Sequence, residues 1–238
     1  MLTLFFTEEI NDGSTQTLEN AEAHHAIKVL RLKLGEVIKI SDGNKKWVSG
    51  PIIEISKKAL KISISESGEF EAKKPELVVV QAVTKSDRSK EMLELLVAAG
   101  VDRIIPWQAD RAISKWQSDS AQKWEIVIKE ACKQARQIKL PKVMSMLSTT
   151  GVVQLLTKDA QAIVFHESAT EKFSQLLLSQ TLTSLYIIIG PEGGITQSEL
   201  ASFENGGFKI VRLGDTVLRS AHAGFAAIAA VQTKLGWW

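Results

Sequence analysis

The stretch IIIGPEGGITQSE, residues 187–199, predicts a strand, a glycine-rich turn and the start of a helix in direct succession. Its isoleucines belong to an apolar run that is typical of a strand buried on both faces. Thr196 and Glu199 have the spacing of a capping box, in which the two side chains hydrogen-bond to free amides at a helix N-terminus. A buried strand that leads through a short turn into a helix is typical of a parallel α/β sheet.

The same alternation of strand and helix extends around this stretch. Apolar runs such as VVV at residues 78–80 predict further strands whose faces are both covered by helices. Strands are predicted at residues 77–83, 103–106, 162–166, 185–189 and 209–213, and helices at residues 88–99, 121–138, 198–204 and 221–235. This order predicts an α/β fold with a parallel sheet, whose ligands bind beyond the carboxyl ends of the strands.

The first 70 residues have a different character. Short runs with a period close to two predict strands at residues 2–6, 36–41, 47–55 and 60–64, and one helix is predicted around residues 20–30. Together these elements predict a small β-barrel or sandwich. The polar segment SGEFEAKKP, residues 67–75, is interpreted as a linker. We therefore expect a β domain over residues 1–70 and an α/β domain over residues 75–238.

Composition limits the class of protein. The chain has 238 residues, enough for one large domain or two small ones, and its 29 Lys and Arg against 27 Asp and Glu give a net charge of only +2. That balance excludes a globally basic nucleic-acid coat but allows a local basic patch. Cys132 is the single cysteine, which excludes a disulfide framework and a cysteine-based zinc site within one chain.

The sequence also predicts a soluble cytoplasmic protein that binds neither a membrane nor a metal. No stretch approaches the roughly 18 uninterrupted apolar residues of a membrane-spanning helix. The N-terminal segment MLTLFFTEEI carries acids where a secretory signal carries positive charge. A single cysteine suits a reducing compartment.

The turn at residues 189–195 is the first candidate ligand site. It matches neither the dinucleotide pattern GxGxxG nor the phosphate-binding pattern GxxxxGK[ST]. It has no lysine for phosphates, and Glu192 would repel them. A ligand with an adenine or ribose edge therefore suits the turn better than a triphosphate. The alternative is a tight strand-to-helix turn that needs glycine for backbone geometry alone.

Two more polar loops follow predicted strands. The loop at residues 213–220 carries Arg219, a permanent cation suited to a phosphate, a carboxylate or a developing anion. Phe165-His166-Glu167 ends another strand. The alternative for Arg219 is a surface ion pair, and the alternative for His166 is a hydrogen-bonded structural role. Three such loops at the ends of three strands together favour a pocket.

Basic residues recur at helical spacing between residues 129 and 139, as Lys129, Lys133, Arg136 and Lys139. A helix face of this kind suits the phosphates of a nucleic acid. The alternative is an ordinary solvated face, which any run of charge can form. Charge alone therefore leaves RNA binding open.

Together the motifs resemble those of the RsmE family, SPOUT-class methyltransferases that make 3-methyluridine in 16S ribosomal RNA. The resemblance rests on GPEGG at residues 190–194, on Leu213-Gly214 and on Val217-Leu218-Arg219. HAIKVLR at residues 25–31 is similar to the family's N-terminal domain, and the resemblance covers almost the whole chain. One departure is Ser220-Ala221-His222, where many members have Thr-Glu-Thr.

The resemblance implies a PUA-like β-barrel that helps to hold RNA, followed by a SPOUT α/β domain with a parallel sheet and a deep trefoil knot. It also implies a homodimer, the small ribosomal subunit as RNA partner, and S-adenosylmethionine (SAM) as cofactor. The expected cofactor contacts are His166, Ile189, Gly190, Pro191, Glu192, Gly193, Gly194, Leu213, Gly214, Val217, Leu218 and Ser220. The expected RNA contacts are Arg31, Arg111, Lys133 and Arg136.

The implied reaction is the direct in-line transfer of a methyl group from SAM to N3 of a uridine. The uracil imide is weakly acidic and needs help to ionise. Arg219 is the candidate for stabilising the anion, and Glu192 is the candidate acceptor of a hydrogen bond or a proton.

The sequence allows three alternatives to this reaction. A non-catalytic RNA-binding protein that keeps the fold is favoured by the altered Ser220-Ala221-His222 segment. A SPOUT methyltransferase that acts on another RNA also stays open. A nucleotide-utilising enzyme such as a dehydrogenase is disfavoured, because both phosphate fingerprints are absent from the sequence.

Overall fold

The computed structural model describes residues 2–179 and 181–238 and divides the chain into two compact units. The first unit contains the chain up to Ala72 together with Cys132–Leu140, and the second contains Lys73–Ala131 with Pro141–Trp238. Each unit has its own sheet and its own buried core.

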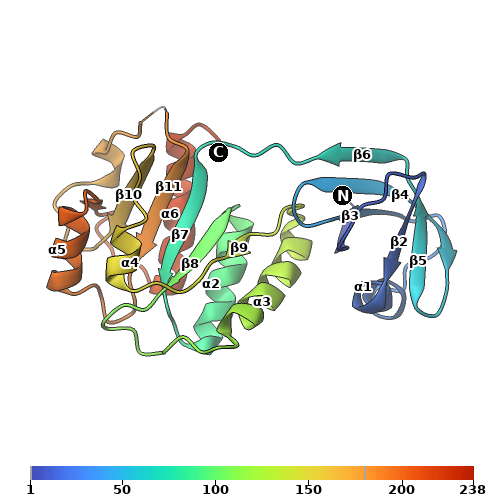
Figure 1. Ribbon diagram of the computed structural model, residues 1–238, viewed down its shortest axis with the longest axis horizontal. Coiled ribbons are helices and arrows are strands. Elements are labelled where there is room, and N and C mark those ends of the chain that lie inside the picture. The colour runs from blue at the N-terminus through green and yellow to red at the C-terminus, as the bar shows by residue number, and fades with distance from the viewer. Residues whose placement is uncertain (1, 180) are drawn as a thin grey trace. The chain divides into compact units, whose positions relative to one another are not determined.

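The second unit is built on a sheet of parallel strands (Figure 1). Across the sheet these are β12 (Lys209–Val211), β10 (Ala160–Phe165), β11 (Ser184–Ile189), β7 (Glu76–Ala82), β8 (Arg103–Trp107) and β9 (Lys142–Val143). The structure confirms the parallel sheet and the five strands that the sequence predicts, with ends that differ by one or two residues. The sequence does not predict β9, because two residues carry no periodicity.

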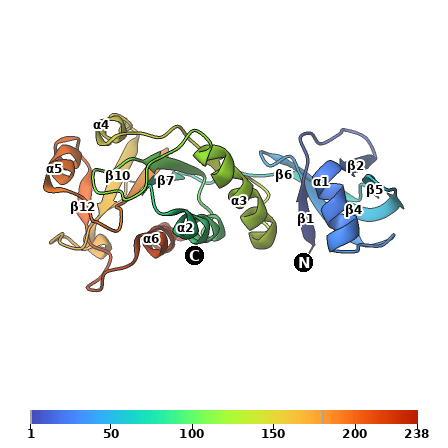
Figure 2. The same ribbon diagram turned by 90° about the horizontal axis from the view of Figure 1, so that it is seen from below.

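Helices cover both faces of this sheet (Figure 2). They are α2 (Ser86–Ala98), α3 (Ser120–Ala135), α4 (Thr149–Val153), α5 (Gln197–Asn205) and α6 (Ser220–Lys234), with a short 3-10 turn at Phe173–Gln175. On one face Val78, Val80 and Ile188 join Val152 of α4 and Phe203 of α5 in a buried cluster. On the other face α6 packs against β7 and β11, and α2 packs against α6. In the described part of the chain, no helix combines the length and the apolar composition needed to cross a membrane.

The first unit contains the strands β1 (Thr3–Phe6), β2 (Thr15–Glu19), β3 (Val37–Ser41), β4 (Lys46–Ile55), β5 (Ala59–Ser63) and β6 (Glu66–Glu69). β1 and β3 are parallel, and the remaining pairs, β3 with β4, β4 with β5, β5 with β2 and β4 with β6, are antiparallel. Alternate side chains such as Phe5, Ile40 and Ile62 form the core of this unit. The unit is thus the small β structure that the period-two runs predict.

Three details of the first unit differ from the prediction. β6 overlaps the predicted linker at residues 67–69. Its sequence ESGE has no apolar residue, yet it pairs with β4 through the backbone. β2 is not predicted either, since Leu18 is its only aliphatic side chain. The predicted helix at residues 20–30 is a short α-helix, α1 (Asn20–His24), followed by a π-helical turn (His25–Val29).

The segment Cys132–Leu140 joins the first unit through contacts far apart in the sequence. Ser41 Oγ donates to the carbonyl oxygen of Ile138 at 2.8 Å, and the amide of Leu140 donates to the carbonyl oxygen of Gly43 at 2.8 Å. Because these bonds are long-range, no local sequence pattern predicts them.

Cys132 is fully buried in α3, and this burial raises the pKa of its thiol to about 12. The thiolate is the reactive form of cysteine, and with this pKa only about 10⁻⁴ of the thiol is ionised at pH 8. The buried sulfur is also out of reach of a reagent in solution. We expect a disulfide reagent such as DTNB to leave the native chain unmodified at pH 8 and to modify one thiol per chain after denaturation. Rapid modification of the native chain, followed by absorbance, would contradict this prediction.

Candidate functional site

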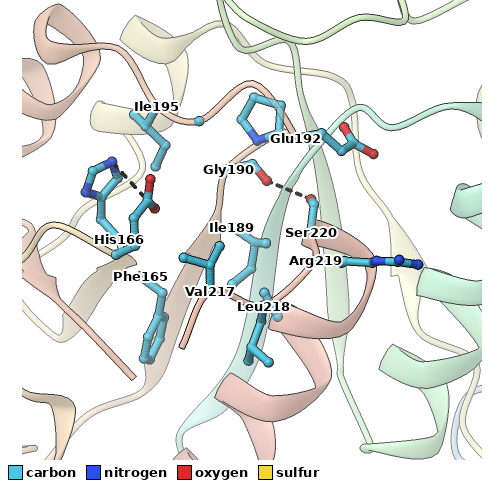
Figure 3. A pocket seen from close by; sticks show the side chains of 14 residues that line it. Phe165, His166, Ile189, Gly190, Glu192, Ile195, Val217, Leu218, Arg219 and Ser220 are labelled. Atoms are coloured by element: carbon cyan, nitrogen blue, oxygen red, sulfur yellow. Dashed lines mark hydrogen bonds and ion pairs between the residues drawn. The ribbon is translucent and has the colours of Figure 1, made fainter. Parts of the chain in front are cut away.

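A cavity of about 300 Å³ lies at the carboxyl ends of β10 and β11, beside the first turn of α6 (Figure 3). Residues 165–167, 189–192, 194–195 and 217–220 contribute to it, whereas Gly193, an expected cofactor contact, does not line it. These segments come from the three loops that the sequence singles out, and the parallel sheet places them at one edge because each follows the carboxyl end of a strand.

The cavity contains most of the residues expected to contact a cofactor. Those that line it are His166, Ile189, Gly190, Pro191, Glu192, Gly194, Val217, Leu218 and Ser220. Leu213 and Gly214 line a smaller cavity of about 80 Å³ that shares His166, Val217 and Leu218 with the first. The sequence does not single out Ile195 or Ala223 of α6, which also line the larger cavity. Both are apolar residues beside a motif, and nothing in their type distinguishes them from core residues.

The glycines of the loop after β11 serve the geometry of the loop itself. A Cβ on Gly190 would lie 2.7 Å from Cγ1 of Ile195, and a Cβ on Gly193 would lie 3.0 Å from the backbone oxygen of Arg111. Gly194 has φ +75°, a conformation that favours glycine. The tight-turn explanation therefore accounts for these glycines, and the turn that they make forms one wall of the cavity.

Ser220 connects two of the three loops. Its Oγ donates to the carbonyl oxygen of Gly190 at 2.7 Å (Figure 3). The same oxygen accepts from Nε2 of Gln81 at 3.1 Å. Gln81 is fully buried in β7, so one side chain from the centre of the sheet supports the hydroxyl that holds the loop after β11. The sequence gives no signal for Gln81, because a single polar residue in an apolar strand does not show what it contacts.

We expect Ser220→Ala to weaken SAM binding about tenfold. The substitution removes a hydrogen bond on each side of the hydroxyl and loosens the loop at Gly190, and each lost bond costs about 1 kcal/mol. Isothermal titration with SAM measures the effect. Ser202→Ala is the matched control, because the Ser202 hydroxyl bonds only the backbone of its own helix at Ser198 among the described residues. Equal SAM affinity in both variants would contradict the positioning role.

His166 is held by the turn that follows β10. The amide of Ser168 donates to its Nδ1 at 3.3 Å, and the hydroxyl of Ser168 lies 2.8 Å from the same nitrogen. Nε2 lies 3.9 Å from Oε2 of Glu167. The ring is 9% exposed and lines the cavity. His166 is therefore both hydrogen-bonded within its own turn and placed where Nε2 can meet a ligand.

Arg219 and Glu192 lie at the rim of the cavity, and both are exposed. Figure 3 shows the guanidinium of Arg219 directed away from His166 and Ile195, on the opposite side of the cavity. In the described part of the chain, Arg219 forms no ion pair, so its charge is available to an anionic ligand. Among the described residues no group of three or more His, Cys, Asp or Glu side chains could hold a metal ion.

Glu199 fastens the loop after β11 to two other elements. The predicted capping box at Thr196 is confirmed, since the amides and side chains of both residues bond reciprocally. The carboxylate of Glu199 also accepts from the amide of Asp110 at 2.9 Å and from Oγ1 of Thr149 at 3.1 Å. Thr149 accepts in turn from the indole of Trp107 at 3.2 Å. These additional partners are long-range and have no sequence signal.

The four residues expected to contact RNA have different surroundings. Arg31 and Arg136 are exposed in the first unit, each with φ +56° where a helix ends. Arg111 donates from Nη1 to the carbonyl oxygen of Gly193 at 3.3 Å, so it supports the cavity loop. Nζ of Lys133 lies 2.8 Å from Oε1 of Glu22, and 8% of the Lys133 side chain is exposed. Its charge is therefore compensated, and the structure does not favour it as a phosphate contact.

Known proteins share both parts of this chain. The sequence matches the RNA methyltransferase domain family over residues 71–232 and the RNA methyltransferase PUA domain family over residues 18–65. It is 32% identical over 244 residues to the ribosomal RNA small subunit methyltransferase E of Mycobacterium bovis, over 99% of this chain and 93% of that protein. This chain belongs to the RsmE family of RNA methyltransferases. The RsmE protein of Bacillus subtilis is 24% identical over 96% of this chain and 94% of its own length.

Solved structures share the fold. The RsmE protein of Neisseria gonorrhoeae, solved bound to S-adenosyl methionine, has a TM-score of 0.88 and 24% identity, over 98% of both chains. A probable rRNA-methyltransferase from Porphyromonas gingivalis has a TM-score of 0.83 and 26% identity, again over 98% of both chains. The predicted family and the predicted fold class, a SPOUT α/β domain preceded by a PUA-like domain, are thus confirmed. The trefoil knot stays a prediction.

Proposed function

We propose that this chain transfers a methyl group from SAM to N3 of a uridine in the 16S rRNA of the small ribosomal subunit. The observation that carries the proposal is that the signature loops of the RsmE family meet around one cavity at the carboxyl edge of the sheet. The names of the relatives supply the class of RNA. The choice of uracil N3 rests on the family resemblance of the motifs.

The residues around the cavity fit SAM. Phe165, Ile189 and Ile195 give apolar walls for the flat surface of an adenosine, and backbone groups of the loops offer partners to its polar edges. Glu192 and Glu167 complement a positively charged ligand, and the described residues that line the cavity include no lysine. When bound, SAM would supply a methyl group on a sulfonium centre, and the signature loops would hold the cofactor.

The side chains at the rim act on the uridine. Arg219 stabilises the anion that forms when N3 loses its proton, because a guanidinium without a carboxylate partner can pair with the negative uracil edge. Glu192 accepts a hydrogen bond or the proton from N3. The loops around Gly190 and Leu218 fix the direction of approach, since transfer at a methyl group needs collinear donor and acceptor atoms.

The remaining parts of the proposal concern assembly and location. Residues 1–70 form the PUA-like RNA-binding domain and residues 75–238 the methyltransferase domain, folded with the trefoil knot that the family resemblance implies. The protein acts as a homodimer in the cytoplasm, where ribosomal subunits are made. Val217 and Trp238, 76% and 59% exposed in the single chain, are apolar surfaces that a second copy could cover.

Incubation with labelled SAM and small ribosomal subunits from a strain that lacks the endogenous enzyme tests the function. Nucleoside mass spectrometry should detect 3-methyluridine at one position of the 16S rRNA. Another methylated nucleoside would change the acceptor atom in the proposal. If SAM binds but no nucleoside is methylated in subunits or in free RNA, the proposed reaction is wrong.

The exposed arginines of the first unit should contribute to RNA affinity through phosphate contacts. We expect a variant with both Arg31→Ala and Arg136→Ala to lower the slope of log Kd against log salt by about 1.4 for single-stranded RNA, about 0.7 for each phosphate contact. Filter binding at several salt concentrations measures the slope. Lys158→Ala, which removes an exposed cation before β10, is the control. An unchanged slope in the double variant would remove both arginines from the RNA face.

A further inference from the structure

A second cavity of about 310 Å³ lies beyond the carboxyl end of β7. Val83 and Thr84 follow that strand, the first turns of α2 and α3 supply other walls, and the loop after β8 closes one side. None of the residues that line it lines the SAM cavity. Its volume is at the lower end of the range of roughly 300–1,000 Å³ for small-ligand pockets, which suits one nucleotide better than a larger ligand.

Two indole rings form the aromatic wall of this cavity. Trp116 and Trp124 have ring centroids 4.8 Å apart and planes at 89° to each other. A planar ligand that lies parallel to one ring is therefore perpendicular to the other, so it gains a stacked contact and an edge contact together. Trp124 is 6% exposed and anchors the pair, whereas Trp116 is partly exposed at the cavity. Unpaired bases of RNA are recognised by stacking on aromatic rings of this kind.

Three lysines surround the aromatic wall. Nζ of Lys123 lies 2.8 Å from Oδ2 of Asp119, and Nζ of Lys90 lies 3.9 Å from Oε1 of Glu94. Lys115 is exposed and makes no ion pair with any described residue. Among the described residues that line the cavity there are three cations and one carboxylate, that of Asp119. The ligand that this charge suits is an anion.

The cavity also has polar groups in fixed positions. The hydroxyls of Thr84 and Ser89, both buried, lie 3.0 Å apart, and a hydroxyl pair keeps lone pairs free to accept from a base edge. Gln108 fixes the loop that carries Trp116 through two hydrogen bonds. Its Oε1 accepts from the amide of Trp116 at 3.0 Å, and its Nε2 donates to the carbonyl oxygen of Ser114 at 3.1 Å. The aromatic wall is therefore held in place before a ligand arrives, which lowers the entropic cost of binding.

The second cavity and the SAM cavity lie at the same edge of the sheet. β7 pairs in parallel with β11, with Gln81 opposite Ile189, so the loops after both strands leave the sheet side by side. Nε2 of His222, in the first turn of α6, lies 2.9 Å from Oε1 of Glu91 in α2. The helical turn that begins beside Arg219 therefore lies against the helix that supplies Lys90 to the second cavity.

We propose that this cavity binds an unpaired nucleotide of the RNA substrate next to the methylated uridine. The base stacks on Trp116, its edge meets the hydroxyls of Thr84 and Ser89, and Lys115 and Lys123 bind the adjoining phosphates. This inference rests on the proposed function, because it takes RNA as the substrate. It adds a site that selects RNA by a nucleotide other than the one that reacts.

Direct RNA binding tests the site without any methyl transfer. The probe is a short single-stranded oligouridine that contains 5-iodouridine, and the proteins are full-length wild type, Trp116→Leu, the pair Lys115→Ala with Lys123→Ala, and the control Lys158→Ala. We expect Trp116→Leu to weaken binding about tenfold, the usual loss for one stacked base. The lysine pair should lower the salt slope by about 1.4. Ultraviolet light should crosslink the probe to the peptide that contains Trp116.

Several results would overturn the site. Wild-type affinity in Trp116→Leu together with a wild-type salt slope in the lysine pair would do so, as would crosslinks confined to other segments. Because the lysines are exposed, their removal leaves the fold intact even if Trp116→Leu does not fold.

A methylation assay separates this site from the proposed function. With small ribosomal subunits, the variants should raise KM for RNA about tenfold while kcat and SAM affinity stay unchanged. A fall in kcat with unchanged KM would contradict a site for a neighbouring nucleotide. If the wild type methylates nothing, the proposed function fails, and the binding and crosslinking results still decide whether the cavity holds a nucleotide.

Discussion

Arg219→Ala should lower kcat for methyl transfer about 100- to 1,000-fold, the usual loss when one group that stabilises a developing anion is removed. Arg219 lies at the rim of the cavity, exposed and without an ion pair in the described part of the chain. In the proposed mechanism its charge stabilises the anion that forms when uracil N3 loses its proton. SAM affinity should be retained, because the guanidinium points away from the His166 side of the cavity. Single-turnover kinetics with labelled SAM measures the rate.

Two further variants sharpen this prediction. Arg219→Lys keeps the charge but loses the planar pair of donors, so we expect a rate between those of the wild type and the alanine variant. Lys209→Ala removes an exposed cation at the opposite end of β12 and should leave the rate unchanged. Wild-type turnover by Arg219→Ala would remove Arg219 from the mechanism. A loss of SAM binding equal to the loss of rate would make it a cofactor ligand instead.

Glu199→Ala should lower the stability of the methyltransferase domain by about 3 kcal/mol or more. The carboxylate is 2% exposed and accepts from the amides of Asp110 and Thr196 and from the hydroxyls of Thr149 and Thr196. Its removal leaves buried donors without a partner, each at a cost of about 1–3 kcal/mol. The corresponding decrease in Tm, roughly 6–12 °C, can be measured by calorimetry.

The same substitution should also weaken SAM binding, because Glu199 holds the end of the loop that begins at Gly190. Glu204→Ala is the matched control, since Glu204 is an exposed carboxylate in the same helix and its removal should change stability by less than about 0.5 kcal/mol. Glu199→Gln keeps the size and one acceptor oxygen, so its Tm should fall between the other two. Equal Tm values for the Glu199 and Glu204 alanine variants would show that the buried hydrogen bonds of Glu199 make no net contribution to the stability of the domain.

The sequence predicts the elements that bury apolar side chains. The sequence predicts the parallel strands because strands such as residues 185–189 are covered on both faces, and a strand of this kind has a continuous apolar sequence. The sequence does not predict β6, because this strand is held by backbone pairing to β4 and carries no apolar residue. Nor does it predict that Cys132–Leu140 belongs to the first unit, since long-range hydrogen bonds leave no periodic pattern in the sequence.

The candidate site also has a part that the sequence predicts and a part that it does not. Its loops can be predicted because the carboxyl ends of parallel strands meet at one edge. The supporting residues Gln81 and Glu199 cannot, since a buried polar side chain reveals its partners only in three dimensions. The structure shows what two residues of the Ser220-Ala221-His222 departure contact. Ser220 supplies the hydroxyl that holds Gly190, and His222 contacts Glu91 and does not line the SAM cavity.

The contacts of the Cys132–Leu140 segment have a consequence for protein synthesis. A chain is released from the ribosome in order, and N-terminal domains generally fold first. Here the first unit has all its strands once Glu69 has emerged, yet Ser41, Gly43 and Glu22 must wait for Ile138, Leu140 and Lys133. A fragment that ends at Ala72 therefore lacks part of its own structure. The nascent N-terminal unit reaches its final form only after residues up to Leu140, well inside the methyltransferase domain, have been translated.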